Sequence, residues 1–159
     1  GDRGGAYVVH CLDVPELTSG LHRWSIKVVE GPSGMFLGVV CPALAPARMM
    51  EAEYIGWSQF QDAAWLLSTT GKSIHGTRSA ENTNVPSLTQ GSIVKFSLDL
   101  RPESSGTLSF SVGESRDVHV IFEGLNSVRT NNGLLPAIWA NGARNSPHQF
   151  EILSFESEE

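Results

Sequence analysis

The sequence contains few cysteines, and their placement excludes several small-protein architectures. Cys11 and Cys41 are the only two, and each lies among apolar neighbours far from the other. Neither a disulfide framework nor a zinc site built on closely spaced cysteines fits this pattern. We expect two reduced, buried thiols, with a single bridge between them as the alternative. The chain also lacks an Asn-x-Ser/Thr glycosylation acceptor, and both observations favour an intracellular, cytoplasmic setting.

Positive charge and long apolar runs are also scarce. There are 11 Lys and Arg residues against 17 Asp and Glu, which gives a formal net charge of -6. No segment interleaves basic and aromatic residues, so we expect no nucleic-acid binding. No apolar run approaches the roughly twenty residues of a membrane-spanning helix, and no secretory signal pattern opens the chain. We therefore expect no membrane partner.

The length of 159 residues fits a single domain covering positions 1–159. Such a chain buries roughly two thirds of the surface that its unfolded form exposes, so its core needs no covalent staples. Because the chain opens on Gly1, we expect it to be part of a larger protein. Gly1 to Gly5 resemble a flexible lead-in and Glu156 to Glu159 a frayed acidic end. We expect the isolated domain to be monomeric.

Catalytic and metal-binding patterns are missing as well. The five histidines lack the helical spacing that places two ligands on one metal: His10, His22, His75, His119 and His148. No Gly-x-Ser-x-Gly elbow occurs, and Leu66 stands where a phosphate loop ending at Gly71-Lys72-Ser73 needs its first glycine. A dispersed Ser-His-Asp triad stays open, because such triads are recognised by geometry. We predict no metal, no cofactor and no enzyme.

The clearest pattern is a pair of alternating runs between Gly91 and Val112. From Ile93 to Leu100, the apolar positions 94, 96, 98 and 100 alternate with more polar ones, and the alternation resumes from Thr107 to Val112. A period of two is typical of half-buried strands. The polar connection between the runs predicts a hairpin. Its apolar face must be covered by other elements, because an isolated hairpin is marginally stable.

Other short apolar or alternating runs predict further strands. We expect these at 6–10, 21–30, 35–41, 65–68, 118–122, 134–140 and 150–155. The run Met35 to Cys41 is continuously apolar, which predicts a central strand covered on both faces. On the second of these strands we expect His22 to be a core histidine bonded to a backbone carbonyl. The pattern indicates an all-β sandwich or barrel with few or no helices.

Two segments lack a clear period. The first, 42–64, contains a stretch at 47–53 that fits a short helix, followed by Tyr54, Trp57 and Phe60. The second, 74–90, is polar and irregular. Long loops in compact domains are often functional, so we expect Tyr54 to be exposed. For Trp57, Phe60 and Trp139, binding contacts and packing against the core are equally consistent with the sequence.

The sequence resembles the SPRY domain, called B30.2 in its longer form. Four stretches carry the resemblance: Leu17–Trp24 with its Gly-x-His-x-Trp pattern, Phe36–Val40 followed by Trp65–Ser68, Gly91–Phe110, and Leu135–Ile138 in the position of a Pro-Ala-Val strand. Ser92, Ser25 and Ser111-Val112-Gly113 depart from the usual residues, which identifies a divergent member. The resemblance implies a bent sandwich of two antiparallel sheets without catalysis.

The resemblance also implies a function. Such domains bind a short peptide or protein loop through surface loops, often inside ubiquitin ligase assemblies. In similar peptide-binding members, the site combines the first inter-strand loop, a tyrosine of the long loop and the turn after the Pro-Ala-Val strand. The corresponding residues here are Leu12, Asp13, Val14, Pro15, Tyr54, Asn141 and Gly142. Because Asn141-Gly142 replaces the Trp-Gly of those members, we do not expect the same peptide ligand.

Three arginines add a hypothesis about the partner. If Arg48, Arg78 and Arg144 lie near the rim of this surface, they favour a partner with acidic character. Two other classes of function stay open on the sequence alone. A lectin-like sandwich would bind carbohydrate with the same aromatic loops, and a purely structural domain would bury its loop face inside a larger assembly.

Overall fold

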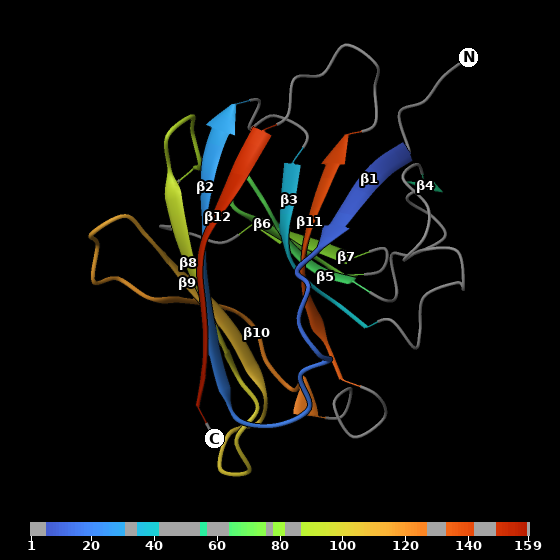
Figure 1. Ribbon diagram of the computed structural model, residues 1–159, viewed down its shortest axis with the longest axis vertical. Coiled ribbons are helices and arrows are strands. Elements are labelled where there is room, and N and C mark those ends of the chain that lie inside the picture. The colour runs from blue at the N-terminus through green and yellow to red at the C-terminus, as the bar shows by residue number, and fades with distance from the viewer. Residues whose placement is uncertain are drawn as a thin grey trace.

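The computed structural model describes residues 6–30, 35–41, 55–56, 64–75, 78–81, 87–126, 133–141 and 149–158. Within these ranges the strands β1 to β12 form two antiparallel sheets. Figure 1 shows the two sheets lying against each other. This architecture confirms the predicted sandwich of two sheets. The alternative prediction, a barrel, is wrong. The lead-in Gly1 to Gly5 and the candidate helix at 47–53 lie outside the described residues.

One sheet has seven strands and the other has five. The seven-stranded sheet contains, in spatial order, β4 (Ile55–Gly56), β1 (Ala6–Cys11), β11 (Leu135–Asn141), β3 (Met35–Val40), β5 (Ala64–Ser68), β6 (Lys72–His75) and β7 (Arg78–Glu81). The five-stranded sheet contains β10 (His119–Phe122), β9 (Thr107–Val112), β8 (Ile93–Asp99), β2 (Leu21–Glu30) and β12 (Gln149–Glu158). Each strand predicted from the sequence overlaps one of these strands.

The predicted hairpin is β8 and β9, which pair from Val94↔Val112 to Asp99↔Thr107. The inward positions of β8 are buried, as the alternation predicts. Trp24 on β2 lies directly opposite Phe96, and their stacked rings have centroids 5.4 Å apart. Phe110 on β9 extends this aromatic row at 6.2 Å from Phe96. These rings form the centre of the core between the sheets.

The seven-stranded sheet carries a second, smaller buried cluster. Its members are Val40, Ala64, Leu66, Leu135, Ala137 and Trp139. Strand β3 lies between β11 and β5 and is buried at almost every position, which confirms that it is central and covered on both faces. Trp139 has a relative exposure of 0% and therefore packs in the core rather than forming a binding contact.

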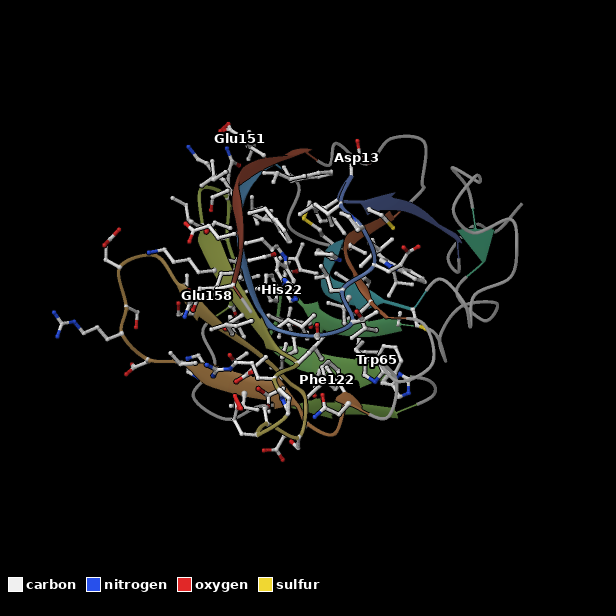
Figure 2. The ribbon with its side chains drawn as sticks, turned by 60° about the horizontal axis from the view of Figure 1, so that its bottom comes forward. Asp13, His22, Trp65, Phe122, Glu151 and Glu158 are labelled. Carbon is white, nitrogen blue, oxygen red and sulfur yellow. The ribbon has the colours of Figure 1, made fainter. Side chains whose placement is uncertain are left out.

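His22 occupies the buried role predicted for it. Its exposure is 4%, and Figure 2 shows it in the interior, between the two sheets. Nε2 lies 2.6 Å from the carbonyl oxygen of Ser19, and Nδ1 lies 2.7 Å from Oγ of Ser157. Because a carbonyl oxygen only accepts, Nε2 donates its proton to the Ser19 carbonyl. His22 thus joins the start of β2 to the end of β12.

Two sequence predictions are wrong. The segment 74–90, predicted to be irregular, contains the end of β6 and all of β7. The acidic end was predicted to be frayed, but β12 continues to Glu158, and Glu158 pairs with Leu21. Cross-strand contacts explain the second difference, since Arg23 lies 3.5 Å from Glu158 and Ser157 bonds His22. Opposite charges and a partly buried hydrogen bond hold a polar strand that hydrophobicity alone does not predict.

The connection between β8 and β9 is fixed by polar contacts. Arg101 donates from Nε and Nη2 to the Asp99 carboxylate, at 2.9 and 2.8 Å. Gly106 has a φ of +89°, and a Cβ there would collide with the backbone nitrogen of Asn126. The N–H of Leu125 donates to the Gly106 carbonyl at 2.9 Å. Glycine is therefore required where the segment after β10 crosses the hairpin connection.

Neither Cys11 nor Cys41 forms a disulfide bond, as expected. Cys41 is buried, whereas Cys11 at the end of β1 is half-buried. Desolvation by the surrounding protein raises the pKa of the Cys11 thiol from 9.0 to about 11. The thiol therefore remains protonated and poorly nucleophilic near neutral pH.

The Asp99–Arg101 contact predicts a pH dependence of stability. The hydrogen bonds from Arg101 lower the pKa of the Asp99 carboxyl below 3.8, against a smaller opposing effect of desolvation. Ionised Asp99 therefore stabilises the fold above its unfolded pKa, and this contribution is lost as the pH falls through the folded pKa. We expect Asp99→Asn to lower the urea midpoint at about pH 7 and to change it much less at about pH 2.5. An equal loss at both pH values would contradict this account, and the exposed Glu114→Gln serves as the control.

The raised pKa of Cys11 predicts slow alkylation. In a Cys41→Ala variant, the rate of modification by iodoacetamide should rise about tenfold per pH unit up to about pH 10, because the thiolate fraction is still growing. N-acetylcysteine amide, measured beside it, should level off near its lower pKa. A plateau for the protein near pH 9 would show that burial does not raise the pKa of this thiol.

Candidate functional site

The described part of the predicted partner-binding surface directly follows β1. We call the segment Leu12 to Leu17 the platform. At its start, the N–H of Leu12 donates to the carbonyl of Pro136 on β11 at 3.0 Å. At its end, Leu17 and Leu134 exchange two backbone hydrogen bonds of 2.8 and 3.0 Å. Both ends of the platform are therefore tied to the beginning of β11.

Between these ends the chain makes a tight turn. The N–H of Val14 donates to the carbonyl of Leu12 at 2.9 Å, which closes a three-residue γ-turn around Asp13. Leu12 and Leu17 are buried, and the half-buried Val14 packs against both core clusters. Asp13 and Pro15 are exposed, and Figure 2 shows the Asp13 side chain pointing away from the strands. The buried leucines thus hold two exposed residues in a fixed place.

Gly133 allows the platform to lie close to the chain before β11. Its φ is +87°, and a Cβ at this position would lie 2.9 Å from Cγ2 of Thr18 and 3.0 Å from the carbonyl oxygen of Leu17. Any side chain would therefore push the platform outward. The backbone bridge between Leu17 and Leu134 depends on this glycine.

The surface of the platform is acidic. Asp13 and Glu16 are both exposed, and no ion-pair partner for either carboxylate occurs among the residues that the structure describes. Glu16 was not among the site residues predicted from the sequence. The sequence could have indicated Glu16, because this acidic residue directly follows Pro15 in the same predicted loop.

The strand register separates the platform from Asn141. Leu12 bonds Pro136 at the start of β11, whereas Asn141 ends β11 and pairs with Tyr7. At about 3.4 Å per residue, the five steps along the strand from Pro136 to Asn141 span about 17 Å. The backbone positions of Leu12 and Asn141 therefore lie near opposite ends of β11.

Most other residues of the predicted surface lie outside the described residues. These are Tyr54, Gly142, Arg144 and Arg48, together with Trp57 and Phe60. Arg78 belongs to β7, at the edge of the seven-stranded sheet opposite β4 and β1. The described ranges contain no group of three His, Cys, Asp or Glu side chains that could hold a metal ion. In the same ranges, no helix has the length and apolar character needed to cross a membrane.

Sequence comparison alone identifies no relative of the chain. No family model matches it, and no curated protein matches it.

Solved structures with the same architecture do exist. A human SPRY domain superposes with a TM-score of 0.55 at 13% identity, over 93% of this chain and 84% of that one. The stonustoxin structure gives a TM-score of 0.56 at 18% identity, and the match covers 87% of this chain but only 20% of stonustoxin. A single mutant of congerin II reaches a TM-score of 0.48 at 9% identity, which is too weak to support an argument. At these low identities the two stronger matches show the fold alone, and the chain has a SPRY-like fold.

Proposed function

We propose that this domain is a protein-binding module and that the platform contacts its partner. The observation that carries the proposal is the fixed exposure of Asp13 and Pro15, held by backbone hydrogen bonds to β11 on both sides. The SPRY-like fold supports the same function, because SPRY domains are interaction modules. More specifically, we propose that the domain recruits a substrate protein to a ubiquitin ligase.

Preorganisation makes the platform suitable for binding. A flexible loop loses conformational entropy when a partner orders it, and this loss weakens the complex. The γ-turn at Asp13 and the bridge between Leu17 and Leu134 already restrict the platform before binding. Pro15 restricts it further through its fixed φ. The platform therefore offers exposed contact area at a small entropic cost.

The charge of the platform suggests the chemistry of the partner. Asp13 and Glu16 present two carboxylates at a protein surface, which favours Lys or Arg side chains on the partner. This differs from the acidic partner suggested by Arg48, Arg78 and Arg144, whose side chains lie outside the described part of the structure. A basic segment of the partner protein is the ligand that the described residues fit best.

Charge reversal on the platform tests this proposal. We expect the double variant Asp13→Lys, Glu16→Lys to weaken partner binding about tenfold or more, because favourable charge contacts become repulsive. Partners would be identified by quantitative capture with the wild-type domain and then measured individually by titration calorimetry.

The control carries the same change of net charge at a distance from the platform. Glu123→Lys, Glu151→Lys reverses two exposed carboxylates after β10 and on β12. Both double variants should unfold within a few degrees of the wild type, because all four side chains are exposed. Equal affinity of the two double variants for every captured partner would show that the platform is not the binding surface.

A further inference from the structure

The outer face of the five-stranded sheet carries a hollow of about 370 Å³, which we call the serine hollow. Five serines line it from β2, β8, β9 and β12: Ser25, Ser97, Ser109, Ser111 and Ser154. Arg23, Lys95, Glu156 and Val118 also line it, together with the core residues Trp24, Phe96 and Phe110 of the same strands. None of these residues belongs to the platform, so the serine hollow is a separate surface from the one proposed above.

The strand register explains why a sheet face is hollowed here. Ser97 lies opposite Arg23 on one side and Ser109 on the other. Lys95 lies in the next row of the same face, between Ser25 and Ser111. Short serine side chains between long basic ones leave a depression, because neighbouring residues on one sheet face stand only about 5 Å apart.

An apolar wall borders the hollow at the edge strand β10. Val118 and Val120 have exposures of 65% and 54%, the largest among the exposed large hydrophobic residues of the described chain. Val120 pairs with Ser109, and Val118 lines the hollow itself. In Figure 1 the connection from β9 to β10 projects outward beside this sheet. Two valines are thus exposed to water next to a polar floor.

The lining on the inner strands β8 and β2 carries the basic side chains Lys95 and Arg23. Lys95 is exposed, and among the described residues no carboxylate pairs with its ammonium group. Arg23 lies 3.5 Å from Glu158, and Glu156 also borders the hollow. The chain as a whole is acidic, with a net charge of -6. The Lys95 ammonium group, which has no carboxylate partner among the described residues and lies beside the serines of the hollow, is complementary to an anionic group of a ligand.

We propose that the serine hollow binds a short extended peptide that carries an acidic and an aliphatic side chain. The carboxylate would contact Lys95, and the aliphatic side chain would cover Val118 and Val120. The serine hydroxyls both donate and accept, so they match the N–H and C=O groups of a peptide backbone. Strand β8 lies two strands from β10, about 10 Å, so the two peptide side chains should be two to four residues apart.

The exposed side chains of Val118 and Val120 favour a peptide ligand over a carbohydrate ligand. An anionic saccharide would use the hydroxyls and Lys95, but it would leave most of the apolar surface of Val118 and Val120 in water. Covering that surface is favourable by about 25 cal/mol per Å². A peptide with both kinds of side chain uses all three parts of the hollow.

Peptide selection tests the proposal directly. A random library of linear octapeptides displayed on phage would be selected on the wild-type domain, and the enriched peptides would be synthesised and measured by fluorescence anisotropy. We expect enriched sequences to place Asp or Glu two to four residues from Val, Ile or Leu. Lys95→Glu and the double variant Val118→Asp, Val120→Asp should each weaken binding at least tenfold, whereas Lys72→Glu on β6 should not.

A measurement on the unmodified domain avoids dependence on the variants. In ¹⁵N-labelled protein, an enriched peptide should shift the amide signals of Ser97, Ser109, Ser111 and Val118 more than those of the platform. Failure to enrich any peptide, or affinity unchanged by Lys95→Glu, would overturn the proposal. So would binding of sialyllactose that requires Lys95 in the absence of peptide binding. Shifts confined to the platform would support the proposed function and refute this second site.

Discussion

The structure depends on the burial of one alternating set of side chains in the five-stranded sheet. Trp24, Phe96 and Phe110 are each about 1% exposed and lie in a row across β2, β8 and β9. Burial of such large aromatic side chains is worth several kcal/mol relative to small ones, so this row dominates the core energetics. The row also fixes the register, because a slip of one residue would exchange it with the polar outer face.

The same alternation creates the outer surface. Once the aromatic residues face inward, Arg23, Lys95 and the serines must face outward, since successive side chains point to opposite sides of a strand. The serines and basic residues of the serine hollow are therefore exposed as a consequence of how the core is packed. The platform has a different origin, because buried leucines and backbone bonds to β11 hold its exposed residues. Two surfaces with different charge thus rest on the same rigid sandwich.

The local pattern predicted most of the fold, whereas several residues of the predicted site lie outside the described residues. Strict alternation located β8 and β9, and the position of His22 on an apolar face predicted its carbonyl bond. Strand β7 was missed, because its sequence RSAE lacks an apolar alternation and it forms by pairing with β6. The separation of the platform from Asn141 could not be predicted, because it depends on the pairing of Tyr7 with a residue far along the chain. Local periodicity carries no information on such long-range register.

The central claim is that the two faces of β8 and β9 alternate between a sealed core and an open surface. Single cysteines at Lys95, Ser97 and Ser111, and at Val94 and Leu108, in a Cys11→Ser, Cys41→Ala background would test it through the rate of alkylation. The account predicts that the first three react at nearly the rate of a free thiol and that the last two react at least about a hundredfold more slowly, because only global or local unfolding exposes them. Similar rates at all five positions, in variants that remain folded, would contradict the account.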